Sequence, residues 1–197
     1  MVVLGIDPGT ARTGFGVVHA EGPRLRALGH GTITTRAGED VAARLAAIAG
    51  AVRELLACHG PDVVALESLY VGANPRTVLG VGQARGAVLA TCGAAGLPSA
   101  EYSPSQVKTA VCGYGRAEKH QVGRMVEAIL HLSQPAGSEH AADALAVAIC
   151  HAHHAATNEI WQGAPKSLSP RARGRGPREA REGEGAVAAN SKPRVVL

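Results

Sequence analysis

The first third of the chain carries the hydrophobic pattern of β-strands. Residues 2–6 are an unbroken apolar run that ends at a Pro-Gly turn, as buried strands do. Two further strands are predicted at 14–19 and 25–35, and the short turn at 21–23 favours an antiparallel meander. Asp7 stands at the exit of the first strand, where a carboxylate is costly to bury unless a metal or a hydrogen-bonding partner meets it.

The pattern then changes to the spacing of amphipathic helices. Apolar positions at 41–58 predict a helix that ends at Gly60-Pro61, and the run at 62–67 predicts a fourth strand with Glu67 at its end. The remaining predicted elements are a helix at 75–95, a short strand before Tyr102, and helices at 103–111, 118–132 and 139–154. Strands followed by alternating strands and helices predict an α/β fold with a mixed five-stranded sheet flanked by helices.

The end of the chain differs in composition from the rest. Residues 1–157 are expected to form one domain, whereas residues 158–197 form a tail rich in Arg, Gly and Pro that we expect to be disordered. The formal net charge is +4, but residues 165–197 alone carry eight basic and three acidic side chains. The tail could therefore touch nucleic acid non-specifically, or be solvated with no dedicated partner. A nucleic-acid role for the domain has to rest on where its own charges lie.

The composition also indicates a compartment. The sequence has no apolar stretch long enough for a membrane span and no pattern of a signal peptide. Its four cysteines are scattered without a C-x-x-C motif, which favours free thiols in a reducing environment. We therefore expect a cytoplasmic protein.

Acidic residues from distant segments are predicted to meet at one end of the sheet. If the first and fourth strands are parallel neighbours, Asp7 and Glu67 lie side by side, while His140 and Asp143 share one face of the last helix. Converging carboxylates repel one another unless cations compensate, and such an oxygen-rich set suits Mg²⁺ or Mn²⁺. Alone, each residue has an ordinary explanation as a turn former, a cap or a solvated helix residue. Their joint occurrence favours a metal site.

Several motifs carry a resemblance to the RuvC family of Holliday-junction resolvases. They run in order over residues 2–154 and are Gly5-Ile6-Asp7-Pro8-Gly9, Ala65-Leu66-Glu67-Ser68, Gly82-Gln83-Ala84-Arg85-Gly86, Pro104-Ser105-Gln106-Val107-Lys108, Ala117-Glu118-Lys119 and His140-Ala141-Ala142-Asp143-Ala144-Leu145-Ala146. The resemblance implies a ribonuclease-H-like fold, a homodimer, and symmetric nicking of four-way junction DNA in recombination and repair. It also implies a branch-migration motor of the RuvA and RuvB type as a partner.

The resemblance further assigns residues to roles. Asp7, Glu67, His140 and Asp143 match the metal-binding positions, where two Mg²⁺ per subunit, replaceable by Mn²⁺, would activate water and stabilise the leaving oxygen. Lys108 and Lys119 match lysines near the scissile phosphate, and Lys119 is expected to stabilise its charge. Tyr70 aligns with an aromatic residue that stacks on a DNA base in relatives.

Basic residues predict where the DNA lies. The segment from Arg76 to Arg124 contains more basic than acidic residues and is the predicted DNA-facing surface; its basic members are Arg76, Arg85, Lys108, Arg116, Lys119 and Arg124. A solvated basic face is the alternative, and it is the favoured interpretation of Arg124. In the same segment, Gly80, Gly82 and Gly86 on one predicted helix would allow close packing at a dimer contact.

Other interpretations stay open from the sequence alone. An actin-like ATPase or sugar kinase also opens with a strand, an Asp and a Gly-Thr turn, although this chain is short for two such domains. A RuvC-like nuclease that trims ribosomal RNA shares the first strand, and a structural junction-binding protein would need no converging carboxylates. His151 and His154 have the spacing of a zinc site, but a partly exposed helix terminus explains them better.

Overall fold

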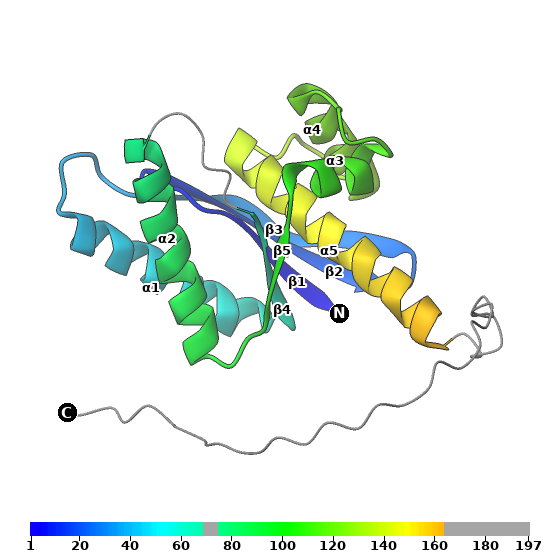
Figure 1. The fold of residues 1–197 in the computed structure, drawn as a ribbon, viewed down its shortest axis with the longest axis horizontal. Helices are drawn as coiled ribbons and strands as arrows, with labels where there is room; N and C mark the ends of the chain where they lie inside the picture. Colours follow the sequence, from blue (N-terminus) through cyan, green and yellow to red (C-terminus); the bar gives the residue numbers. More distant parts are fainter. Residues whose placement is uncertain (69–74, 164–197) are drawn as a thin grey trace, which may run out of the picture. The chain divides into compact units, whose positions relative to one another are not determined.

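One mixed sheet, with β1 at its centre, organises the molecule (Figure 1). The computed structural model describes residues 1–68 and 75–163, without the side chains of 75–77 and 158–163. The strands lie in the order β3-β2-β1-β4-β5 and are β1 Val2–Asp7, β2 Arg12–Glu21, β3 Arg24–Thr34, β4 Val63–Glu67 and β5 Ser99–Tyr102. β1 pairs antiparallel with β2 and parallel with β4, so the predicted parallel neighbours are confirmed.

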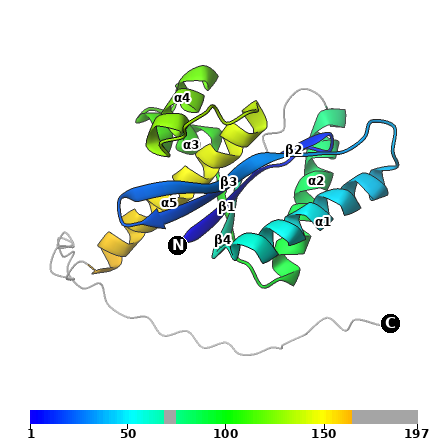
Figure 2. The ribbon, with the colours of Figure 1, turned by 180° about the vertical axis from the view of Figure 1, so that it is seen from behind.

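Helices cover both faces of the sheet (Figures 1 and 2). They are α1 Val41–His59, α2 Pro75–Ala94, α3 Pro104–Cys112, α4 Lys119–Ile129 and α5 Glu139–Gly163. α1 and α2 pack on one face, whereas α5 crosses the other face with α3 and α4 beside it. The predicted α/β class and the mixed five-stranded sheet are confirmed, although α5 continues nine residues beyond the predicted end at His154.

Local sequence signals set several of these boundaries. Asp40 caps α1 by accepting a hydrogen bond from the Ala42 N–H, and Gly60 ends the helix in the left-handed conformation at φ 52°. α3 begins with a capping box in which Ser103 and Gln106 satisfy each other's backbone N–H groups. These turn and cap residues explain why the predicted element boundaries lie close to the observed ones.

The described part of the chain forms one unit. Met1–Gly163 are grouped together by their contacts, apart from Ala164–Leu197, and the predicted disorder of the tail beyond Gly163 concerns residues outside the described ranges. None of the described helices has both the length and the apolar character that a membrane crossing requires.

Strand alternation decides which side chains face α5. In β1, Leu4 and Ile6 belong to the core under α1 and α2, whereas Val3 belongs to the core under α5. Because side chains alternate along a strand, Asp7 is on the α5 side with Val3. In β4, Ala65 lies in the core under α5, which places Glu67 on that side by the same alternation. Both acidic residues therefore turn toward α5.

Glycines let α5 approach this face at backbone distance. A Cβ atom at Gly5 would lie 2.0 Å from the Ala144 carbonyl oxygen, and one at Gly14 would lie 1.9 Å from the His140 carbonyl oxygen. At Gly16 an added Cβ would overlap the Leu145 side chain at 2.7 Å. The absence of side chains at these three positions fixes how deeply α5 sits, and so where its first turn meets the end of β1.

We expect Gly5→Ala to destabilise the fold, because the new methyl group has to push the α5 backbone away from the sheet. Such overpacking lowers the free energy of unfolding by about 1–3 kcal/mol. Urea unfolding detects the loss as a lower urea concentration at the midpoint. Gly123→Ala is the control, since Gly123 lies within α4 with open space around it. Alanine there should raise the free energy of unfolding by about 0.5–1 kcal/mol. A Gly5→Ala protein as stable as wild type would contradict the close seating of α5.

Candidate active site

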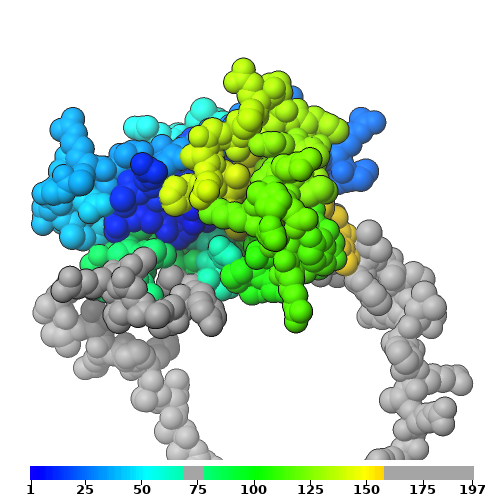
Figure 3. All heavy atoms as spheres, turned by 90° about the horizontal axis from the view of Figure 1, so that it is seen from above, coloured from blue at the N-terminus to red at the C-terminus, as the bar shows by residue number. Residues whose placement is uncertain are grey.

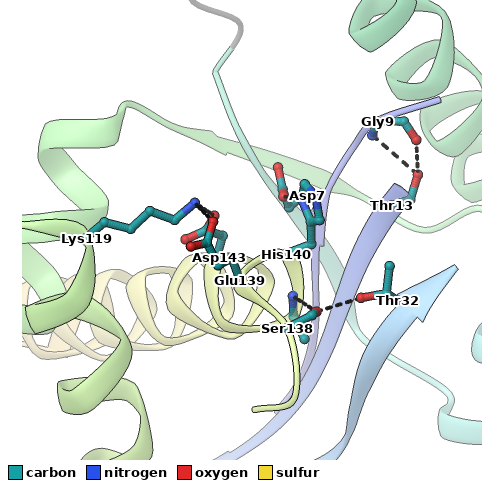
Figure 4. Close-up of polar contacts among 10 residues, drawn as sticks. Asp7, Gly9, Thr13, Thr32, Lys119, Ser138, Glu139, His140 and Asp143 are labelled. Atoms are coloured by element: carbon teal, nitrogen blue, oxygen red, sulfur yellow. Dashed lines mark hydrogen bonds and ion pairs between the residues drawn. The ribbon is translucent and has the colours of Figure 1, made fainter. Parts of the chain in front are cut away.

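His140 contacts Asp7 at the end of β1 (Figure 4). His140 is the second residue of α5, and its Nδ1 lies 2.6 Å from Asp7 Oδ2. A carboxylate only accepts hydrogen bonds, so Nδ1 is the donor and carries a proton. The contact joins the central strand to the first turn of α5.

A lysine from α4 reaches the same turn of α5. Lys119 Nζ lies 3.0 Å from Glu139 Oε2 and 3.1 Å from Asp143 Oδ2, two carboxylates four residues apart on one helix face (Figure 4). Burial opposes the charged form of Lys119, but the hydrogen bonds to Glu139 and Asp143 outweigh it and raise the pKa of the lysine. Lys119 is therefore a cation held beside Asp143.

Glu67 shares a pocket with Asp143 and two lysines. The pocket has a volume of about 220 Å³, and its charged lining residues are Glu67, Lys108, Lys119 and Asp143. Burial raises the pKa of Glu67, and the charges of Asp143 and Asp7 raise it further, against the opposing effect of the lysines. Burial also raises the pKa of Asp143 despite its hydrogen bond with Lys119, and the Asp7 charge adds to that rise. Glu67 is thus within electrostatic reach of Asp7 and Asp143, and Asp143 is within reach of Asp7.

The donor set fits a hard divalent cation in its chemistry. Three carboxylates and one imidazole offer the oxygen-rich ligands that Mg²⁺ and Mn²⁺ prefer. Burial first, and neighbouring negative charge second, raise the pKa of Glu67 and of Asp143, and a bound cation would favour their charged forms. In the arrangement described, Asp7 is engaged by His140 and Asp143 by Lys119. Among the side chains in residues 1–68 and 78–157, no three His, Cys, Asp or Glu are grouped closely enough to hold a metal as they stand.

Hydroxyl groups fix the two segments that carry Asp7 and His140. The buried Thr13 hydroxyl donates to the Gly9 carbonyl at 2.7 Å and accepts from the Gly9 N–H at 3.3 Å, which closes the turn after Asp7 (Figure 4). Ser138, just before α5, accepts from the Ala141 N–H and lies 2.7 Å from the Thr32 hydroxyl of β3. Neither contact was predicted from the sequence, although a serine just before a helix is a recognisable cap signal.

The other predicted site residues have varied locations. Lys108 lines the pocket of Glu67, whereas Arg116 is exposed in the turn between α3 and α4 and is not among the residues that line it. Tyr70 lies outside the described residues, and so does the side chain of Arg76, whose backbone belongs to the first turn of α2. On the molecular surface, the N-terminal segment and the segment leading into α5 reach the same face beside α3 and α4 (Figure 3).

Two interpretations of the sequence need correction. Arg85, predicted to face DNA, is buried and donates to the Glu67 carbonyl, because it lies beside the helical stripe of Ala84, Val88 and Cys92 that faces the core. His151 and His154 are not at a helix terminus, since α5 continues to Gly163. His151 Nδ1 lies 2.7 Å from the Tyr102 hydroxyl, and the His154 ring stacks on Tyr102.

Comparison with known proteins identifies the family. A family model described as crossover junction endodeoxyribonuclease RuvC matches residues 3–151 of this chain. The chain belongs to the RuvC family. RuvC of Moorella thermoacetica is 50% identical over 155 residues, which cover 79% of this chain and 93% of the relative. RuvC of Syntrophomonas wolfei is 52% identical over 153 residues, covering 78% of this chain and 89% of that protein.

Solved structures agree with the family assignment and with the predicted ribonuclease-H-like fold. Thermus thermophilus RuvC in complex with a Holliday junction substrate is 39% identical and superposes with a TM-score of 0.77 over 80% of this chain and 96% of that chain. The yeast mitochondrial Holliday junction resolvase Ydc2 is 15% identical with a TM-score of 0.58, which is a likeness of fold. Divalent-metal dependence accompanies membership of this nuclease family.

We expect Glu67→Gln to raise the thermal midpoint of metal-free protein at neutral pH. Because burial and the neighbouring carboxylates raise the pKa of Glu67 in the folded state, the charged side chain destabilises the fold above that pKa. This destabilisation is absent below the pKa that Glu67 has in the unfolded chain. It develops as the pH rises from that value to the higher folded-state pKa, and is complete above it. Unfolding in EDTA should therefore show a gain at pH 7.5 that disappears near pH 4. An equal or lower thermal midpoint for Glu67→Gln at pH 7.5 would contradict the prediction that the charged Glu67 side chain destabilises the fold.

Proposed function

We propose that Asp7, Glu67, Asp143 and His140 hold the divalent metal with which this chain nicks four-way junction DNA. As a RuvC family member, the chain is a crossover junction endodeoxyribonuclease, a hydrolase of recombination and repair. One observation carries the assignment of the site: Asp7 and Glu67 end neighbouring parallel strands on the α5 side, where α5 delivers His140 and Asp143. Mutual repulsion of these carboxylates is the property that a bound cation relieves.

We assign the metal as two Mg²⁺ per subunit, with Mn²⁺ able to replace them. When bound, such a pair supplies an activated water and a stabilised leaving oxygen. Asp7 lies at the centre of the set, next to Glu67 on the neighbouring strand and in contact with His140. His140 orients the Asp7 carboxylate through its Nδ1 hydrogen bond, and Lys119 does the same for Asp143. The Thr13 and Ser138 contacts keep both segments in place before DNA arrives.

Basic side chains next to the pocket would receive the DNA backbone. Lys108 and Lys119 line the pocket with Glu67 and Asp143, so their ammonium groups can meet a phosphate there, and Lys119 can stabilise the charge that develops on it. Arg116 is exposed in the turn between α3 and α4 and is a further candidate contact, as is Arg76 near the start of α2. Tyr70 follows β4 in the sequence and is assigned a stacking role from the family resemblance.

We expect Asp7→Asn to lower the rate of junction nicking by at least about 10²-fold, because it removes the central charge of the site. Junction binding in EDTA should persist. The measurement compares a synthetic mobile four-way junction with a linear duplex, with and without Mg²⁺, and reads paired symmetric nicks. Asp40→Asn makes the same chemical change at the cap of α1, where asparagine still caps, and should cut like wild type.

Three results of that experiment would contradict the proposal. If Asp7→Asn nicks the junction at the wild-type rate, Asp7 is not part of the active site. Junction binding by the wild-type chain without any Mg²⁺-dependent cut would instead indicate a structural junction-binding protein. Equal cutting of the junction and the linear duplex would contradict the proposed specificity for four-way junctions. The family match already favours the junction nuclease over the actin-like ATPase and the RNA-trimming nuclease.

We further propose a homodimer that uses the outer face of α2. Leu79 is 65% exposed, and the exposed positions Gln83, Gly86 and Ala90 follow it at helical spacing along one face. Gly86 and Gly82 have open space around them, whereas Gly80 faces inward against the Thr10 hydroxyl and so does not belong to this surface. Two sites related by a two-fold axis would nick symmetric strands of a two-fold junction.

We expect Leu79→Glu to convert the dimer into a monomer, because the exposed leucine would be buried at the centre of the contact. Size-exclusion chromatography with light scattering measures the mass. Met125→Glu is the control, since Met125 is an apolar residue on α4 with 40% exposure and lies outside the α2 face. A Leu79→Glu protein that stays dimeric would place the contact elsewhere.

Two further proposals follow from the family and the chemistry of the chain. A branch-migration motor of the RuvA and RuvB type is the proposed partner, a proposal that rests on family membership. A cytoplasmic location is proposed because the four cysteines are free thiols, with Cys92 and Cys150 buried.

A further inference from the structure

A buried arginine on α2 is attached to the backbone of the proposed metal-binding Glu67. Arg85 is 6% exposed, and its Nη1 donates to the Glu67 carbonyl oxygen at 2.8 Å. Its Nη2 forms an ion pair with Glu101 of β5, whose side chain is 52% exposed. The guanidinium therefore bridges the end of β4 and the neighbouring edge strand.

Burying this guanidinium is costly unless its donors are satisfied. An apolar residue next to the buried stripe of Ala84, Val88 and Cys92 would carry no such cost, so the arginine has to be explained by what it binds. The planar guanidinium can reach two acceptors in fixed directions, whereas a lysine offers a single point charge. Here one acceptor is the backbone oxygen of Glu67 itself.

The backbone at Glu67 has to be held in place against the repulsion that acts on its side chain. The Glu67 side chain faces α5, where Asp7 and Asp143 repel its charge. A strand end that carries a repelled carboxylate would relieve the repulsion by moving away. Arg85 approaches from α2 on the opposite face of the sheet and holds the carbonyl of the same residue, while the Ser68 N–H is held by the Tyr102 carbonyl at 2.8 Å.

The same helix also contacts the turn that follows Asp7. A Cβ atom at Gly80 would lie 3.3 Å from the Thr10 hydroxyl, so α2 rests against the chain three residues after Asp7. α2 thereby touches the segments that leave both catalytic strands. This arrangement makes α2 a common support for the two carboxylates, with Arg85 as its polar link.

We propose that Arg85 is a positioning residue that holds the backbone of Glu67 so that its carboxylate stays available to the divalent cation. The proposal rests on the proposed metal-binding role of Glu67. It predicts that losing the guanidinium weakens cation binding more than it weakens junction binding, because the DNA does not contact a buried side chain. It also predicts that the loss is partly restored by a residue that can still donate to the Glu67 carbonyl.

The experiment compares Arg85→Met, Arg85→Lys and Glu101→Gln in the full chain. Mn²⁺ is titrated into the DNA-free protein and the rise in thermal midpoint is followed, since a ligand of the native state raises it. Mg²⁺-dependent nicking of a four-way junction is measured in parallel. Arg85→Met should need about 10-fold or more cation in both assays, the size of effect seen when support of a metal ligand is lost. Arg85→Lys should lie between Arg85→Met and wild type.

Glu101→Gln is the matched control for the ion pair. It removes the exposed partner but leaves the Arg85 bond to the Glu67 carbonyl, so its cation requirement should stay near wild type. Junction affinity in EDTA should be unchanged in all three variants. A role confined to stability would lower the midpoint in EDTA in Arg85→Met but leave its Mn²⁺ and Mg²⁺ requirements at the wild-type values, and that result would overturn the proposal.

Two further outcomes are also decisive. If Arg85→Met does not fold, Arg85→Lys carries the test: a rise of at least about threefold in the cation requirement supports the proposal, and a wild-type value overturns it. Glu67→Gln separates the two levels of the argument. If Glu67→Gln binds Mn²⁺ and cuts like wild type, the proposed role of Glu67 fails. If Glu67→Gln loses Mn²⁺ binding and cutting while Arg85→Met keeps the two, the proposed role of Glu67 stands and only that of Arg85 is refuted.

Discussion

The contact between the α5 backbone and the bare surface of β1 and β2 is the constraint on which the site depends. Gly5 and Gly14 leave no room even for a methyl group below the Ala144 and His140 carbonyls. Because α5 sits so close to the sheet, its first turn comes within hydrogen-bonding distance of the end of β1, and His140 meets Asp7 there at 2.6 Å. A larger residue under α5 would move one half of the site relative to the other.

This close seating creates an electrostatic conflict that the rest of the structure has to manage. Asp7, Glu67 and Asp143 are partly removed from water and repel one another, which raises the pKa of Glu67 and Asp143. His140, Lys119 and Lys108 supply partial compensation from α5, α4 and α3. Fixed contacts hold the segments against the remaining repulsion: Thr13 of β2 holds the turn after Asp7, Ser138 holds the start of α5, and Arg85 holds the carbonyl of Glu67. A fold that holds like charges together in this way is prepared to bind cations.

The sequence predicted the helices and strands well, and failed where side chains from different layers meet. The strands around Asp7 and Glu67 could be recognised because apolar runs end there at turn residues. Arg85 was assigned to the DNA surface from its charge, although its position on the apolar stripe of α2 indicated burial. The pairing of Lys119 with Glu139, and of Ser138 with Thr32, joins segments whose spatial proximity no local pattern encodes. Tyr70 and the Arg76 side chain lie outside the described residues, so their roles remain predictions.

The sequence alone determined the mixed α/β class, the order of the elements, and the carboxylates placed at strand ends and on the last helix. These features follow from hydrophobic periodicity and turn chemistry, which act over a few residues. Only the tertiary structure decided that Asp7 and Glu67 face α5, that the guanidinium of Arg85 lies behind Glu67, and that glycines set the depth of α5. Such facts depend on which faces pack together and at what distance, and packing is a property of the whole chain.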